Sequence, residues 1–407
     1  MKKSNNFSIV PPHLAVKSMR DNGYRNTAYA IAELIDNSIQ HGASNVELIC
    51  IEKDQFISSR TVSRIDQIAI LDNGSGMNSD VLRMALQFGN GTNLDAQTPE
   101  TIGKFGMGLP SSSISQAKRV DVYTWQNGVE NAIYSYLDLD EIISGDMDEV
   151  PVPMKQKVPG LWKQVIGKTG QTGTLVIWSE LDRCLWRTGK TIIDHSEFIV
   201  GRMYRKFINS GQSRINATVY KENSYGNPIL EQEFLANDPL YLMGNTSVSE
   251  LLIEEGLPDP MFVKYGGQDG FEKIYTVNFN GKNSKVHVRY SIASELVRKG
   301  VNPGSRKHGK HAKENVGVSV MRAGRELDLD RSWVNTYDPR ERWWGVEIDF
   351  PPALDEVFGV TNNKQYAVHF KEMGELDIDR ELKDRQQTIQ EYKDELRDDN
   401  DPKVYLL

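Results

Sequence analysis

Glu33 and Asn37 lie four residues apart in the segment 33–38, Glu-Leu-Ile-Asp-Asn-Ser. On a helix, side chains with this spacing project from the same face. A carboxylate can accept a proton from an attacking water, and a carboxamide oxygen is a hard, neutral ligand of the kind that Mg²⁺ accepts. The pair therefore suits metal-assisted hydrolysis, although a helix with a polar face explains the same spacing.

A second group of residues follows an apolar segment, 68–71, that has the character of a strand. Asp72 would stand at the end of that strand, before Gly74, Gly76 and Met77. Glycine allows backbone conformations that a Cβ forbids, so a flat ring can approach closely. The carboxylate of Asp72 could accept a hydrogen bond from the exocyclic amine of adenine, and Met77 offers a soft apolar face. A plain strand–turn–helix connection is the alternative.

Two further motifs carry glycine or threonine. The first contains Gly103, Lys104, Gly106, Met107 and Gly108, and a helix is predicted to begin near its end. Free N–H groups at a helix start attract phosphate. The run is not a P-loop, because no Gly-Lys-Ser/Thr sequence ends it.

The other motif places Thr174 at the start of a predicted strand, 175–178. Its hydroxyl could reach a base through water. Taken alone this signal is weak, because β-branched residues are normal in strands.

The surrounding sequence predicts the elements that would hold these motifs. Hydrophobic periodicity and breaker residues indicate an α+β fold with domains at 1–190 and 191–370 and a charged helical tail at 371–407. The predicted helices are 12–20, 27–41, 79–86, one from about 108, and 197–209. The predicted strands are 46–52, 65–71, 120–125, 174–178, 215–220, 273–279, 286–290, 317–322 and 345–350.

The order and spacing of the four motifs resemble the GHKL ATPase superfamily, which includes DNA gyrase, a heat-shock chaperone family, histidine kinases and MutL. The resemblance covers about residues 8–185 and implies a Bergerat-type ATP-binding α/β sandwich. It implies that Glu33 is the general base, Asn37 the Mg²⁺ ligand and Asp72 the adenine-reading carboxylate. Residues 88–102 would form the ATP lid. The remaining ATP-binding residues would be Gly74, Gly76, Met77 and Thr174 around the base, and Gly103, Lys104, Gly106, Met107 and Gly108 around the phosphates.

The second half of the chain is similar to MORC-type ATPases. The similarity lies in a strand at 344–350, the run 358–365 and the segment 316–326. It implies a transducer-like α+β domain of the ribosomal S5 domain 2-like type, in which Lys364 contacts the γ-phosphate and Gln365 assists. A surface lysine at a helix start is the alternative reading. Pro110 departs from the pattern, because many MORC-like relatives carry lysine there.

Composition limits the class of protein and its partners. The chain has 407 residues, of which 39% are hydrophobic, so it can build real cores. Its net charge of −8 argues against indiscriminate nucleic-acid binding. One dense basic cluster remains that could contact DNA, or a nucleotide across a dimer, unless it is simply solvated: Arg306, Lys307, Lys310 and Lys313.

The number of cysteines and the hydropathy of the chain indicate the cellular compartment that we expect. Two cysteines far apart in the sequence fit a reducing environment. No apolar run reaches the roughly 18 residues of a membrane span, so we expect no membrane contact and a cytoplasmic location.

We therefore expect an ATPase that binds and hydrolyses Mg-ATP. It would act as an ATP-gated homodimeric clamp on DNA, together with partner subunits. A chaperone-like protein-remodelling ATPase and a regulatory ATP-binding subunit with little hydrolysis are the alternatives. A histidine kinase is disfavoured, because those enzymes usually lack the glutamate that Glu33 supplies.

Overall fold

The computed structural model describes residues 12–21, 23–89, 107–166, 170–222, 224, 227–361 and 365–407. The chain divides into two compact units. The first comprises the described residues within 1–96, 103–200 and 210–234, and the second those within 97–102, 201–209 and 235–407. Each unit is mixed α+β, as the sequence predicted.

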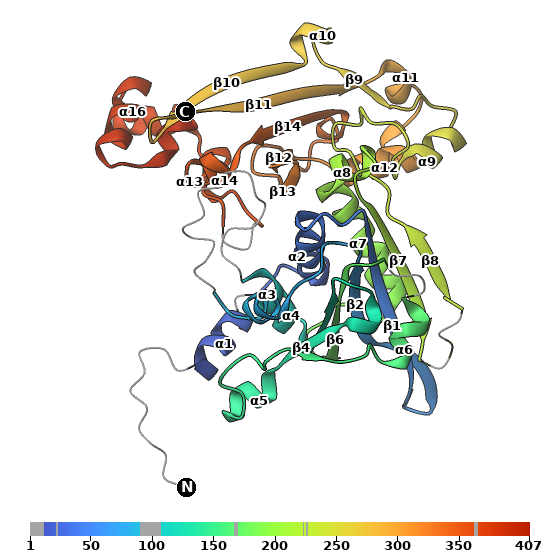
Figure 1. Ribbon diagram of the computed structural model, residues 1–407. Helices are drawn as coiled ribbons and strands as arrows, with labels where there is room; N and C mark the ends of the chain where they lie inside the picture. The colour runs from blue at the N-terminus through green and yellow to red at the C-terminus, as the bar shows by residue number, and fades with distance from the viewer. Residues whose placement is uncertain are drawn as a thin grey trace. The chain divides into compact units, whose positions relative to one another are not determined.

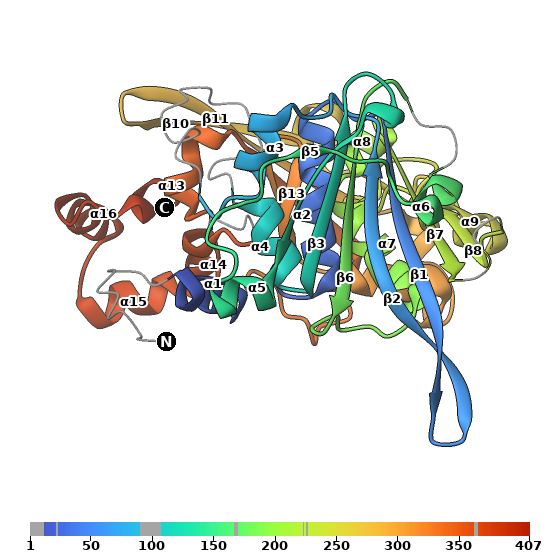
Figure 2. The same ribbon diagram turned by 60° about the horizontal axis from the view of Figure 1, so that its bottom comes forward.

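The first unit is built on an eight-stranded sheet in the order β5-β4-β3-β6-β2-β1-β7-β8 (Figure 2). Every neighbouring pair is antiparallel except β1 and β7. Its strands are β1 (Asn45–Ile57), β2 (Arg60–Asp72), β3 (Ala117–Trp125), β4 (Ile133–Asp138), β5 (Met154–Lys155), β6 (Gly173–Leu181), β7 (Arg214–Lys221) and β8 (Leu230–Glu233). Its helices include α1 (Pro12–Asp21), α2 (Thr27–Gln40), α3 (Ser79–Ala85), α4 (Gly108–Ile114), α5 (Leu139–Ser144), α6 (Gly160–Val165) and most of α7 (Gly189–Met203).

Side chains from both faces of this sheet are buried, and each face packs against helices. On one face, the indole of Trp178 in β6 donates a 2.8 Å hydrogen bond to the Ser113 hydroxyl of α4. On the other face, Trp125 of β3 packs in one buried cluster with Trp162 of α6. Because strand side chains alternate between faces, helices on both sides leave little of the central sheet exposed.

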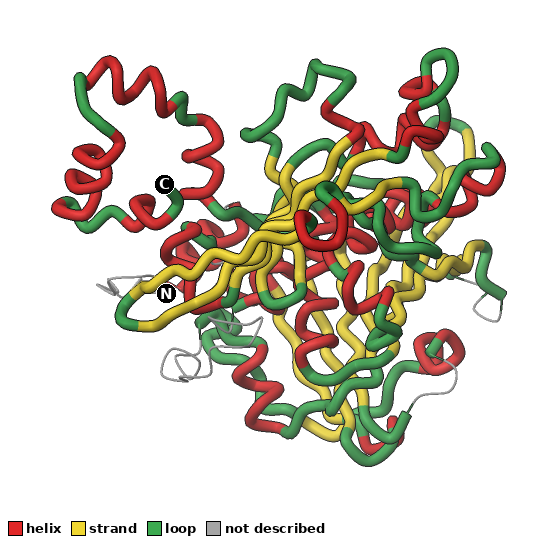
Figure 3. Tube along the Cα trace, turned by 90° about the horizontal axis from the view of Figure 1, so that it is seen from above, coloured by secondary structure: helices red, strands yellow, loops and turns green. Residues whose placement is uncertain are grey.

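The second unit contains a six-stranded sheet in the order β10-β11-β14-β12-β13, with β9 also pairing to β11 (Figure 1). Its strands are β9 (Phe262–Lys264), β10 (Glu272–Phe279), β11 (Lys282–Ala293), β12 (Val318–Arg322), β13 (Arg325–Asp330) and β14 (Trp344–Phe350). Its helices include α8 (Arg205–Asn209), α9 (Ser249–Glu254), α10 (Gly267–Gly270), α11 (Glu295–Arg298), α12 (Lys307–Glu314), α13 (Asp355–Phe358), α14 (Val368–Glu375), α15 (Ile378–Arg385) and α16 (Ile389–Asp398). In Figure 3 the β10–β11 hairpin is the long pair of yellow strands that ends in a green turn.

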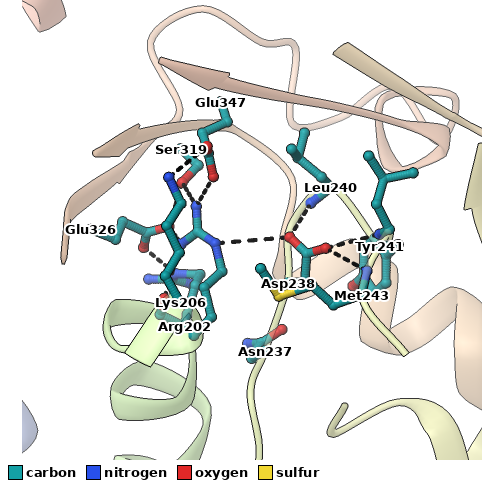
Figure 4. Close-up of polar contacts among 12 residues, drawn as sticks. Arg202, Lys206, Asn237, Asp238, Leu240, Tyr241, Met243, Ser319, Glu326 and Glu347 are labelled. Carbon is teal, nitrogen blue, oxygen red and sulfur yellow. Dashed lines mark hydrogen bonds and ion pairs between the residues drawn. The ribbon is translucent and has the colours of Figure 1, made fainter. Parts of the chain in front are cut away.

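A buried ionic network joins α8 to this second sheet (Figure 4). The guanidinium of Arg205, which has no exposed surface, donates to Glu326 at 2.9 Å, to Glu347 at 2.6 Å and to Ser319 at 2.7 Å. Burial alone would raise the pKa of Glu347, but the charges of Arg205 and Lys206 lower it to about 2. Glu347 is therefore ionised inside the unit, where an unpaired charge would be very costly.

Three features differ in detail from the sequence-based expectation. The strand predicted at 215–220, after the boundary at 190, is β7 and pairs with β1 in the first sheet. The helix predicted at 197–209 is divided into α7 and α8. The charged tail was expected as one helix but contains α15 and α16, separated where Gln386 adopts a positive φ of 54°. That conformation ends a right-handed helix.

Among the residues that the structure describes, no helix combines the length and apolar character that a membrane crossing requires.

Candidate functional site

The helix predicted to carry Glu33 and Asn37 is α2. It begins at Thr27, where the side chain of Asn26 accepts hydrogen bonds from the backbone of Ala28 at 2.9 Å and Tyr29 at 3.2 Å. Such a cap satisfies N–H groups that have no partner within the helix. Glu33 is only 5% exposed, whereas Asn37, one turn later, is half-buried.

The carboxylate of Glu33 lies against the first residue of α4. A Cβ built on Gly108 would stand 2.1 Å from Oε1 of Glu33, far closer than real atoms approach. Gly108 therefore has to lack a side chain for Glu33 to occupy this place. Met107 precedes Gly108 as the N-cap of α4, and its side chain makes no capping hydrogen bond. Because Gly108 is the first residue of α4, the Glu33 carboxylate lies near the end of the helix where the first backbone N–H groups have no partner within the helix.

Hydrogen bonds hold the Asp72 side chain at the end of β2. The Ser38 hydroxyl donates to its Oδ2 at 3.0 Å, and the backbone N–H of Gly74 donates to its Oδ1 at 2.8 Å. Burial raises the pKa of this carboxyl, and both hydrogen bonds oppose the rise. The carboxylate thus has a defined orientation.

The backbone after Asp72 approaches β3 closely. Gly76 has a positive φ of 65°, and a Cβ there would lie 2.1 Å from the carbonyl oxygen of Trp125. The next residue, Met77, donates its N–H to the Thr124 hydroxyl at 2.9 Å. That hydroxyl lies 3.1 Å from the hydroxyl of Thr174. The second and fourth motifs are therefore brought together through Thr124.

Strand register explains this convergence. In the antiparallel pairing of β2 with β6, Asp72 lies opposite Thr174. In the pairing of β3 with β6, Thr124 lies opposite the same threonine. The end of β2, the end of β3 and the start of β6 therefore lie side by side at one end of the sheet.

Sequence reasoning missed two members of this group, Ser38 and Thr124. Ser38 directly follows Asn37 in the first motif, so its position was a usable signal. No local motif in the sequence marks Thr124, because only the register of β3 against β6 places it beside Thr174.

The structure describes only some of the predicted site residues. Gly103, Lys104, Gly106 and Lys364 lie outside the described residues, as does most of the expected lid at 88–102. Gln365 belongs to the second unit, where it is 1% exposed and its backbone N–H donates to the Thr361 hydroxyl at 3.3 Å.

The polar groups at this end of the sheet are of the kinds that a nucleotide base can bind. An oriented carboxylate, two threonine hydroxyls and a close glycine backbone suit a flat, amine-bearing ring. Within the described ranges, no group of three or more His, Cys, Asp or Glu side chains could hold a metal ion. The amide oxygen of Asn37 is a type of ligand that Mg²⁺ accepts.

A family model matches part of the first unit. Residues 24–169 match the family model described as "Histidine kinase-, DNA gyrase B-, and HSP90-like ATPase". No match was found among curated proteins. One similar solved structure is described as "Crystal Structure of N terminal domain of a DNA repair protein"; it is 13% identical, with a TM-score of 0.46, and the match covers 91% of this chain and 98% of that chain. The family match over residues 24–169 supports an ATP-binding domain of the GHKL type in the first unit.

Proposed function

We propose that the first unit binds Mg-ATP and hydrolyses it with Glu33 as the general base. The observation that carries this proposal is the position of the Glu33 carboxylate against Gly108, at the start of α4. Phosphate bound at that helix start would place the γ-phosphoryl group near the carboxylate. Asn37, on the same face of α2, would hold Mg²⁺ through its amide oxygen.

Replacing Glu33 by glutamine tests this role with little change in shape. We expect ATP binding to persist and turnover to fall by ~10² to 10⁴-fold, the usual effect of losing a general base. Glu52 is a matched control, because it is equally buried in the first unit but bonds Gly189 N–H at 2.7 Å and the Ser63 hydroxyl at 2.8 Å. Wild-type turnover in Glu33→Gln would reject the base assignment, whereas Glu52→Gln should leave turnover intact.

We propose that Asp72 recognises the amine of adenine. Gly74, Gly76, Met77 and Thr174 would surround the ring. Asp72→Asn should weaken ATP and ADP binding, because an amide cannot reproduce the acceptor pattern of a carboxylate. Asp66→Asn, earlier on the same strand, is the control. Equal ATP affinity of Asp72→Asn and wild type in calorimetry would contradict the proposal.

The likeness to MORC-type ATPases leads us to propose that Lys364 contacts the γ-phosphate, with Gln365 assisting. A lysine that stabilises departing charge acts mainly in the transition state. Lys364→Ala should therefore cut turnover far more than it weakens ATP binding, and Lys364→Arg should rescue poorly. Unchanged turnover in Lys364→Ala would remove this residue from the mechanism.

ATP-driven dimerisation into a clamp on DNA is the next step of the proposal. Arg306, Lys310 and Lys313 are exposed and support a phosphate contact. Lys307 is less suited, because its ammonium pairs with Glu254 at 2.5 Å. We expect DNA binding that weakens with salt and requires a non-hydrolysable ATP analogue, together with a dimer detected by light scattering.

Charge reversal at Lys310 and Lys313 should abolish this DNA binding. The same reversal at Lys371, an exposed residue of α14, should not. Nucleotide-dependent protection of an aggregating client without DNA binding would instead favour the chaperone-like alternative.

A further inference from the structure

β10 is an edge strand of eight residues that lacks the features which usually prevent pairing with another strand. Among the described residues, β10 pairs only with β11 and ends its sheet. Natural edge strands are usually short, interrupted by proline or charged along their length. β10 contains no proline, and its only charges are Glu272 and Lys273 at its start. The Glu272 carboxylate is already held by Arg289 at 2.8 Å.

The register of the hairpin shows which backbone groups face outward. Asn280 and Gly281 form a two-residue turn, with φ of 50° and 75°, between the paired residues Phe279 and Lys282. The residues that flank such a turn exchange hydrogen bonds, and the bonded pairs then alternate along the ladder. The Tyr290 N–H, which bonds the Phe271 carbonyl at 3.0 Å, fits the same alternation.

The even-numbered residues of β10 consequently direct their N–H and C=O groups away from β11. These residues are Glu272, Ile274, Thr276 and Asn278. The side chains beside them include two apolar groups, Ile274 and Tyr275, that are each 51% exposed. An edge with free backbone groups and exposed apolar side chains is a template for another strand.

We propose that β10 pairs with β10 of a second copy of this chain, antiparallel and centred on Tyr275. This pairing uses all four outward-facing residues, since Ile274 meets Thr276 and Glu272 meets Asn278 of the second copy. A pairing centred on Thr276 would leave Glu272 without a partner.

Side-chain charge supports self-pairing. Centring on Tyr275 places Lys273 opposite Val277 of the second copy and Glu272 opposite Asn278, so no like charges face each other across the strands. The two Tyr275 rings meet at the two-fold axis, and such aromatic cross-strand pairs stabilise sheets. The edge is thus complementary to itself, which is the requirement for a closed two-fold dimer.

This contact lies entirely within the second unit and needs no nucleotide. It is therefore separate from the ATP-driven dimerisation proposed above. Sedimentation of the full chain without nucleotide tests it, and we expect a dimer whose fraction rises with protein concentration. A chain that stays monomeric at several hundred micromolar without nucleotide would overturn the proposal.

A charge exchange at Tyr275 makes the test specific. Tyr275→Lys and Tyr275→Asp should each weaken dimerisation by at least about tenfold, because like charges would then meet at the axis. An equal mixture of the two variants should recover the dimer. Each variant should retain the wild-type melting temperature, since this side chain is half exposed. Dimers that are indifferent to both changes, or a mixture that stays monomeric, would contradict the pairing.

Cross-linking checks the register. Non-bonded antiparallel partners have Cα atoms about 4.5 Å apart, within reach of a disulfide. In a Cys184→Ser background, with Cys50 buried, Tyr275→Cys should give a covalent dimer on oxidation. Ile274→Cys is the matched control: it is equally exposed but would lie diagonally from its copy, about 7–8 Å away. More efficient linking through Ile274→Cys would reject the proposed register.

Discussion

Gly76 provides the sharpest test of how the first unit builds its site. An alanine at this position faces two separate costs. Its φ of 65° is unfavourable for any residue with a Cβ, and that Cβ would stand 2.1 Å from the Trp125 carbonyl oxygen. Gly42 offers a matched control, because its φ is 78° and a Cβ there would meet nothing within 4 Å.

The two costs can be estimated separately. The positive φ should cost an alanine about 1 kcal/mol at either position. Overpacking adds about 1–3 kcal/mol, and only at Gly76, since the obstacle there is backbone that cannot rotate away. Gly42→Ala should therefore lower the melting temperature by about 2–4 °C, and Gly76→Ala by about 4–16 °C, at about 2–4 °C per kcal/mol.

Nucleotide binding distinguishes the two variants further. Relief of the Gly76 contact has to move either the 72–77 turn or the end of β3, so Gly76→Ala should weaken ADP binding by tenfold or more in calorimetry. Gly42→Ala should leave it unchanged. Equal effects of the two substitutions on melting temperature and affinity would refute the reasoning, because the close approach to Trp125 would then contribute nothing.

Three other outcomes follow from the described contacts. Ser38→Ala removes one hydrogen bond to Asp72 and should weaken adenine-nucleotide affinity about fivefold in calorimetry, a loss of ~1 kcal/mol. Arg205→Met removes the ion pairs that Arg205 makes with the buried carboxylates of Glu326 and Glu347, although Arg202 still pairs with Glu326 and Arg289 with Glu347. It should cost about 1.5–3 kcal/mol in urea unfolding, whereas Lys190→Met, from an exposed pair, should cost under about 1 kcal/mol. Because the pKa of Glu347 is lowered to about 2, its contribution is complete above its unfolded pKa of about 4.3 and is lost as pH falls towards 2. Urea midpoints of the wild type should fall over that range, and a flat profile would contradict this pairing.

Local patterns in the sequence predicted much of the fold. The periodicity of residues 27–41 predicted a helix, and α2 occupies 27–40. The strand predicted at 345–350 is β14, and the one at 273–279 is β10. These predictions succeed because helix and strand periods depend on neighbouring residues alone. The motif order likewise predicted a GHKL-type domain, which the family match supports.

The same local patterns predicted only some of the residues of the candidate site. Glu33, Asn37 and Asp72 could be proposed because each stands in a local motif. Thr124 could not, because its hydroxyl joins the site only through the register of β3 with β6, 50 residues further along the chain. The roles of these residues remain proposals, and Lys364 lies outside the described residues.

What the sequence by itself determined is therefore local: the helix of Glu33 and Asn37, the strand that ends at Asp72, and the glycines that follow it. What only the tertiary structure decided is which distant segments meet. β7 pairs in parallel with β1 across more than 150 residues, and the Gly76 backbone packs against Trp125. Such pairings are chosen by the burial of whole sheet faces and by close packing, to which residues far apart in the chain contribute together. A short stretch of sequence therefore does not predict which distant strand it pairs with.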